Sequence, residues 1–104
     1  MKSVIYTNKE KPDIKQHRIL TEKLHNTFQE KNIAYGNSFR DTFKEYGIIA
    51  ALTRITDKFN RFKTLALKRE TCAGDESIID TLMDMANYCL MTVMEIKHED
   101  NRDS

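Results

Sequence analysis

Apolar side chains recur at helical spacing in four segments of the chain, and glycine or proline lies between the segments. The pattern predicts helices over about 13–32, 38–46, 48–68 and from Asp75 to about 98. The first carries a stripe made of Ile14, His17, Leu20, Leu24 and Phe28. The third gathers six apolar residues in a narrow arc: Ile48, Leu52, Ile55, Phe59, Phe62 and Ala66. Ser38 and Asp41 have the spacing of a capping box at the start of the short second helix.

Three long helices and one short helix predict an all-α fold, in the form of a compact bundle with antiparallel neighbours. The chain of 104 residues has the size of one domain. We expect an N-terminal arm over 1–12, a single all-α domain over 13–98 and a charged C-terminal tail over 99–104. Residues 3–7, "SVIYT", resemble a strand, but a lone strand has no pairing partner, so we interpret them as extended.

The predicted fourth helix is apolar around most of its circumference and carries one polar line. Its apolar side centres on Ile78, Leu82, Met85, Ala86, Cys89 and Val93. The opposite arc holds Asp80, Asp84, Asn87 and Met91, and methionines and a leucine border it. Helices of this kind are usually buried, and carboxylates one turn apart repel each other unless a positive charge lies between them.

Three interpretations of this acidic line remain open. The carboxylates could be solvated, or they could pair with Arg or Lys of a neighbouring helix. In the third interpretation, which we carry forward as the prediction, they bind Mg²⁺ or Mn²⁺, because hard cations prefer carboxylate oxygens together with water and phosphate. The predicted metal ligands are Asp57, Glu76, Asp80 and Asp84.

The predicted third helix has a basic row opposite its apolar face. Arg54, Lys58 and Arg61 surround Asp57 there, either as a solvated face or as a phosphate-binding site.

A base-binding site is predicted at the turn between the first and second helices. Tyr35 or Phe39 could stack on a base there, although a core role for Phe39 is favoured. Asn37 or Asn87 could read the edge of that base.

Composition limits the function classes. The net charge of +1 indicates no particular partner, and the nucleic-acid footprint is weak because the basic residues are spread among acids. The chain has no Walker loop, zinc spacing or nucleophile motif. We expect no signal peptide and no membrane span, hence a cytoplasmic protein of the host cell with Cys72 and Cys89 as free thiols. The apolar fraction of 39% is lean, and together with the apolar circumference of the fourth helix it predicts a homo-oligomer, most simply a dimer.

Three stretches resemble one family: "YGNSF" at 35–39, "RITDKFNRFKTL" at 54–65 and "DESIIDTLMDMANYC" at 75–89. Their order and spacing resemble the nucleotide modification associated domain 1 proteins of phages and prophages, over residues 17–96. That family is in turn reminiscent of the all-α MazG-like pyrophosphohydrolases, which use Mg²⁺ to split nucleoside triphosphates. The chain departs from the MazG pattern, because it lacks a Glu-Glu-x-x-Glu helix and has Thr81 where a glutamate would stand.

Two functions are consistent with these features. The resemblance implies a phage-type protein of nucleotide metabolism that binds a nucleoside triphosphate with Mg²⁺, with or without hydrolysis to monophosphate and pyrophosphate. The alternative is a non-enzymatic module that senses nucleotides or docks on a host or phage protein, since the methionine-rich border of the fourth helix suits an adaptable surface. No residue is assigned a catalytic role.

Overall fold

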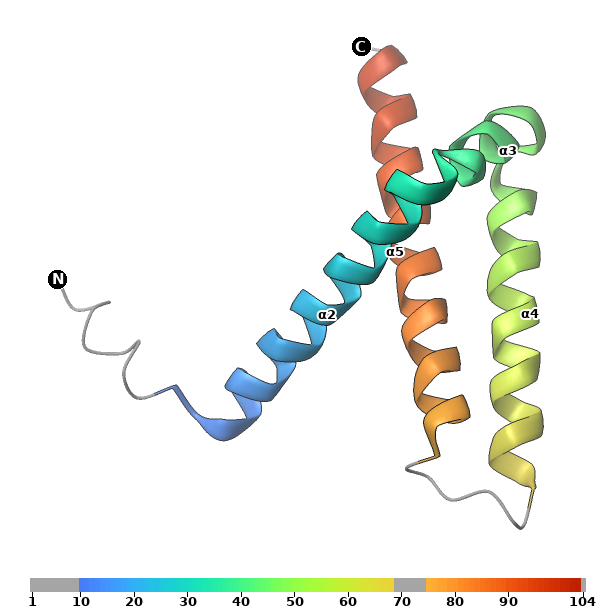
Figure 1. The fold of residues 1–104 in the computed structure, drawn as a ribbon. Helices are drawn as coiled ribbons and strands as arrows, with labels where there is room; N and C mark the ends of the chain where they lie inside the picture. Colours follow the sequence, from blue (N-terminus) through green and yellow to red (C-terminus); the bar gives the residue numbers. More distant parts are fainter. Residues whose placement is uncertain (1–9, 69–74, 104) are drawn as a thin grey trace, which may run out of the picture. The chain divides into compact units, whose positions relative to one another are not determined.

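The computed structural model describes residues 10–68 and 75–103, and these ranges hold four helices and no strand. The helices are α2 (Pro12–Tyr35), α3 (Ser38–Tyr46), α4 (Ile48–Leu67) and α5 (Glu76–Asp103) (Figure 1). The prediction of an all-α fold with three long helices and one short helix is confirmed. The predictions for residues 3–7 and Cys72 lie outside the described residues. No helix in the described part of the chain is long and apolar enough to cross a membrane.

The chain divides into two compact units, Met1–Ala34 and Tyr35–Ser104. Nearly all of α2 belongs to the first unit, and α3, α4 and α5 make up the second. This division falls inside the range 13–98 that the sequence predicts as one domain.

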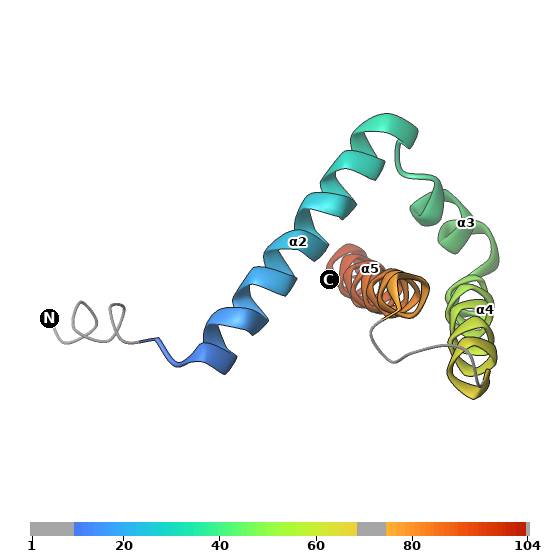
Figure 2. The same cartoon turned by 60° about the horizontal axis from the view of Figure 1, so that its bottom comes forward.

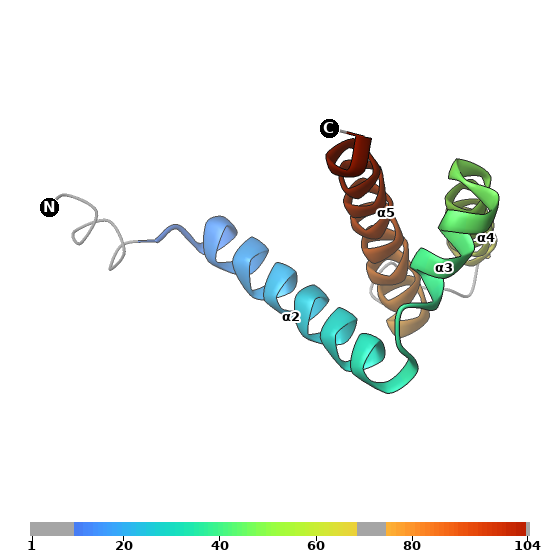
Figure 3. The same ribbon diagram turned by 90° about the horizontal axis from the view of Figure 1, so that it is seen from above.

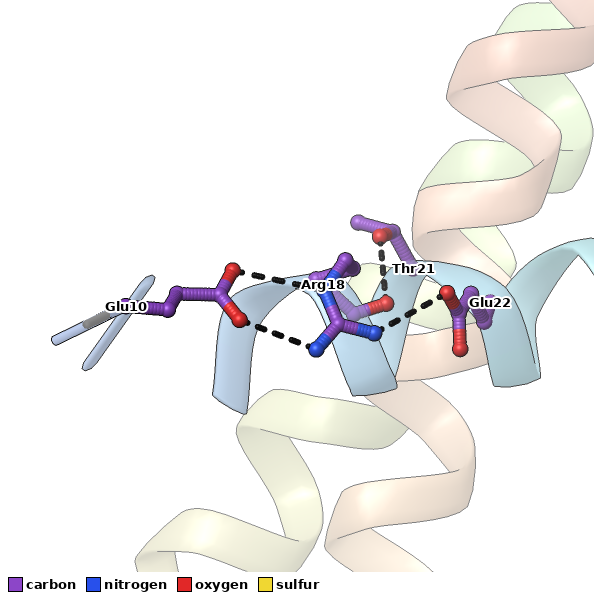
Figure 4. A network of polar contacts seen from close by, with 4 residues as sticks. All are labelled: Glu10, Arg18, Thr21 and Glu22. Atoms are coloured by element: carbon purple, nitrogen blue, oxygen red, sulfur yellow. Dashed lines mark hydrogen bonds and ion pairs between the residues drawn. The ribbon is translucent and has the colours of Figure 1, made fainter. Parts of the chain in front are cut away.

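Helix α2 opens at Pro12, whose fixed φ and missing N–H suit the first position of a helix. An ion-pair network lies over its first turns: Arg18 donates to Glu10 at 2.9 Å and to Glu22 at 3.2 Å (Figure 4). Of the predicted stripe, Leu24 is buried and Phe28 half-buried, whereas Ile14, His17 and Leu20 are exposed.

Glycines form the joints at both ends of α3. Gly36 and Gly47 have φ of 75° and 73°, a backbone region that is costly for residues with a Cβ. The N–H of Gly47 donates to the carbonyl of Phe43 at 2.7 Å and closes the last turn of α3. The predicted capping box is not formed, because Asn37 occupies the cap position and makes no side-chain cap bond.

Helix α5 begins where the sequence predicts and ends later. The Asp75 carboxylate accepts the N–H of Ser77 at 2.7 Å, which satisfies one of the free donors at the start of the helix. The helix then continues through the charged segment to Asp103, since no glycine or proline interrupts it.

Helices α4 and α5 run antiparallel and side by side, and α3 contacts both (Figures 1, 2 and 3). The buried residues of α5 are Ile78, Thr81, Thr92 and Glu95, and with the half-buried Met85 and Tyr88 between them they form one row at alternating spacings of three and four. We call this the packed row of α5. A matching row of buried or half-buried residues runs along α4: Ala51, Ile55, Lys58, Phe62 and Leu65. Both rows have the period of helices packed in a bundle.

The packed row differs from the face that the helical wheel indicates. Leu82, Cys89 and Val93 lie at the centre of the predicted apolar side, yet all three are exposed. The buried positions beside them include Thr81 and Thr92, whose hydroxyls each donate at 2.7 Å to the carbonyl four residues earlier. These bonds satisfy the hydroxyls, so polar residues can occupy the packed row without an unpaired donor.

Candidate functional site

One ion pair joins the basic row of α4 to the acidic line of α5. Lys58 Nζ lies 3.2 Å from Asp84 Oδ2, and the two side chains are 29% and 33% exposed. Asp84 also has further interactions. Of the three interpretations of the acidic line, pairing with a cation of the neighbouring helix is therefore the one seen at Asp84.

The other two cations of the row remain open to solvent. Arg54 lies one turn before Lys58, and Arg61 lies three residues after it, so all three share one face of α4. Both arginines are exposed, and neither side chain makes an ion pair or hydrogen bond with residues 10–68 or 75–101. Their guanidinium groups are consequently available to an anion.

The predicted metal ligands do not come together within one chain. Asp57, Glu76 and Asp80 are exposed, and only Asp84 is half-buried. Among the described residues, no group of three or more His, Cys, Asp or Glu side chains could hold a metal ion. No three of the four acids therefore meet in one group in the described part of the chain, and both the metal site and its Mg²⁺ or Mn²⁺ stay predictions.

The residues predicted to bind a base lie in different surroundings. Tyr35 is 77% exposed at the end of α2, and Asn37 is the exposed cap residue of α3. Asn87 is half-buried and has interactions of its own. Phe39 packs with its ring 6.2 Å from that of Phe43 and 5.8 Å from that of Tyr88. Phe39 thus contributes to an aromatic cluster between α3 and α5, as its favoured core role predicts.

The most buried charge among the described residues of the second unit is one that the sequence interpretation misses. Arg40 Nε donates to both carboxylate oxygens of Glu95, at 2.8 Å and 3.1 Å, and links α3 to α5. The Glu95 side chain is 5% exposed and that of Arg40 29%. The signal in the sequence is the spacing of the packed row, which continues from Ile78 to Glu95 and marks that glutamate as an inward position.

Comparison with known protein families gives a match. The model of the family described as nucleotide modification associated domain 1 matches residues 31–96, which is more than half of the chain. No curated protein and no solved structure matches the chain, so the MazG-like part of the resemblance gains no support. The matched range contains α3, α4 and most of α5, including the Lys58–Asp84 and Arg40–Glu95 pairs. The chain belongs to the nucleotide modification associated domain 1 family.

Proposed function

We propose that the chain binds a nucleoside triphosphate through the basic row of α4, which consists of Arg54, Lys58 and Arg61. The family description, which names nucleotide modification, supports a nucleotide as the ligand class. The observation that carries the proposal is the Lys58–Asp84 pair, because it places a carboxylate at the middle of the basic row. A phosphate oxygen would make the same kind of contact with Lys58 as this carboxylate does.

The exposure of the row suits exchange of one anion for another. The Lys58 and Asp84 side chains are both partly exposed, which is compatible with exchange of the Asp84 carboxylate for a phosphate oxygen at Lys58. Arg54 and Arg61 bracket Lys58 and supply forked donors that match phosphate geometry. A chain of phosphates along α4 would therefore meet three cations in succession.

In this proposal, Mg²⁺ or Mn²⁺ arrives with the nucleotide. The described residues contain no group of three or more acids that could hold a metal ion, whereas metal–nucleotide complexes are commonly held by one or two carboxylates plus the phosphates. In this proposal, Asp84 or the exposed Asp80 supplies such a carboxylate. The hydrolytic form of the function would yield nucleoside monophosphate and pyrophosphate.

Titration calorimetry with ATP, ADP and AMP in Mg²⁺ tests the binding. We expect the triphosphate to bind at least about tenfold more tightly than the monophosphate, which corresponds to about 1.4 kcal/mol. The reason is that each added phosphate offers the row another charge-assisted contact. Equal binding, or none, across the series contradicts the proposal.

Two variants locate the site. Arg61→Ala should narrow the difference between triphosphate and monophosphate, because it removes a phosphate contact rather than a contact to the base. Lys63→Ala is the matched control, since it removes an equally charged side chain from α4 that lies over the Phe59 ring, outside the row. If both variants lost the preference for triphosphate over monophosphate, the preference would come from the overall positive charge of α4 and not from the basic row.

Hydrolysis has its own readout. Pyrophosphate release from a panel of nucleoside triphosphates, with and without Mg²⁺, separates an enzyme from a binding module. Product in Mg²⁺ that disappears in the Asp84→Asn variant supports the enzymatic form. If the nucleotide binds but no pyrophosphate is released, the result supports a nucleotide-sensing role.

A second candidate function rests on the exposed apolar residues of α4. Ile48, Ile49, Leu52, Phe59 and Leu67 are between 49% and 76% exposed, a feature of surfaces that bind other proteins. In that function the chain is a phage-type interaction module that docks on a host or phage protein in the cytoplasm. Nucleotide titrations that show no preference, together with specific capture of one protein that Leu52→Asp abolishes, would favour it. In either function we propose a homodimer as the working form.

A further inference from the structure

Helix α5 carries a second apolar row beside its packed row. The outer row of α5 consists of Ile79, Leu82, Ala86, Cys89, Val93 and Ile96, each one position after a member of the packed row. Leu82, Val93 and Ile96 are 41%, 48% and 42% exposed, and Cys89 is exposed with a free thiol. The outer row is thus turned by about 100° from the face used by α4, and its members are exposed except for Ile79 and Ala86, which are half-buried.

We propose that the outer row packs against the same row of a second copy of the chain, with the two α5 helices antiparallel. Spacings that alternate between three and four are those of a seam between two packed helices. Six consecutive positions of that seam carry no charge and no amide. The interior also needs more burial, because the buried apolar residues described in the second unit are Phe43, Ala50, Ala51 and Ile78.

One antiparallel register places every member of the outer row opposite another. Ile79 then faces Ile96 of the partner subunit, Leu82 faces Val93 of the partner subunit, and Ala86 faces Cys89 of the partner subunit. A twofold axis repeats each pair, so six apolar layers form from three kinds of contact. Large side chains meet at both ends and small ones at the centre, which lets the helices approach closely.

Charges beside the outer row select this partner and this direction. The adjoining positions, seven residues apart, are Glu76, Met83, Leu90 and Lys97. In the same register Glu76 lies beside Lys97 of the partner subunit, and Met83 lies beside Leu90 of the partner subunit. Glu76 and Lys97 are exposed and form no ion pair among the described residues of their own chain.

A parallel arrangement lacks this match. It would bring Lys97 next to Thr92 of the partner subunit, a position already buried in the packed row, and would align two helix dipoles. The antiparallel arrangement opposes the dipoles and pairs opposite charges at both ends. The inference does not depend on nucleotide binding.

Sedimentation equilibrium of the full chain tests the partner and the charge pairs. We expect a dimer at micromolar concentration. Glu76→Lys and Lys97→Glu should each weaken dimerisation about tenfold, because two symmetric attractions become two repulsions. The double variant Glu76→Lys/Lys97→Glu should restore the wild-type affinity. A monomeric wild-type chain, or a double variant no tighter than the single ones, overturns the proposal.

Disulfide formation tests the register independently. Ala86→Cys in a Cys72→Ser background should give a covalent dimer on mild oxidation, since position 86 faces Cys89 of the partner subunit. Asp80→Cys in the same background is the matched control and should crosslink far more slowly, because position 80 lies outside the outer row. Equal crosslinking of the two variants, or none in the first, overturns the register. Circular dichroism of each variant confirms that helix content is retained.

Discussion

Among single residues, Glu95 shows how this small fold holds a charge in its interior. Its carboxylate is almost fully covered, and both oxygens accept from the Nε of Arg40. Burying a lone carboxylate is costly, so the arginine is a requirement of the fold at this position. The pair also fixes α3 against α5, because it joins residues 55 positions apart in sequence.

Removing the arginine should therefore be more harmful than removing the whole pair. Arg40→Leu should lower the free energy of unfolding by about 2–4 kcal/mol, since Glu95 stays buried without its partner. The double variant Arg40→Leu/Glu95→Leu should recover most of that loss. Urea denaturation measures both values. If the double variant were as unstable as the single one, the pair would stabilise the fold through the way it joins α3 to α5, and not only by neutralising the buried charge.

Glu10 should titrate at unusually low pH. Its hydrogen bond with Arg18, assisted by the charges of Arg18 and Lys15, lowers the pKa of this carboxyl below its ordinary value of 4.5 (Figure 4). Because the pKa is lowered in the folded chain, the contact is fully present above pH 4.5 and is lost as the pH falls through the lowered pKa. NMR titration of the Glu10 side chain should show this midpoint, and Arg18→Gln should return it upward. A midpoint unchanged by Arg18→Gln would exclude the network as the cause.

At the scale of the helices, the sequence predicts well which helices exist and in what order they follow. It predicts less well which side of each helix is buried. Gly47 and Asp75 mark boundaries because one adopts a positive φ and the other caps a helix, and both effects are local. Which residues of α5 form the packed row depends on the side chains of α4 and α3 that pack against it. The local sequence pattern of α5 does not contain that information. A helical wheel places the buried side where the hydrophobic residues are concentrated. It therefore predicts that Leu82 and Val93 are buried, whereas in the structure Thr81 and Thr92 are buried.

The cap of α5 gives a test at this scale. Asp75→Ala should lower the free energy of unfolding by about 1 kcal/mol, because the N–H of Ser77 loses its acceptor. Asp75→Asn is the control, since it keeps the acceptor and should lose only a few tenths of that value. Thermal denaturation followed by circular dichroism measures both. An equal loss in the two variants would assign the effect to the charge at the helix start.

At the scale of the whole chain, the candidate site was predictable in part. The proximity of Lys58 to Asp84 follows from two helices that a short connection makes antiparallel, so a basic row and an acidic line could be expected to meet. Convergence of Asp57 with Glu76 and Asp80 could not be derived, because side chains of two different helices converge only if the packing directs them together. In the described structure they point to solvent.

Stability should depend on protein concentration. If two copies share the outer row of α5, unfolding also separates them, and mass action raises the melting temperature as the chain becomes more concentrated. Thermal scans over a hundredfold concentration range should show a steady rise for the wild-type chain. The rise should shrink in Val93→Asp, which puts a charge into the outer row. A melting temperature independent of concentration would indicate a folded monomer.

The adjacency of α4 and α5 along the chain has a consequence for folding speed. Helices that are close neighbours in sequence find each other easily, and such local contacts generally form in microseconds to milliseconds. Joining of two copies requires diffusion and is slower at low concentration. Refolding should therefore show a fast phase that is independent of concentration, as α5 closes on α4, followed by a second phase whose rate increases with the amount of protein.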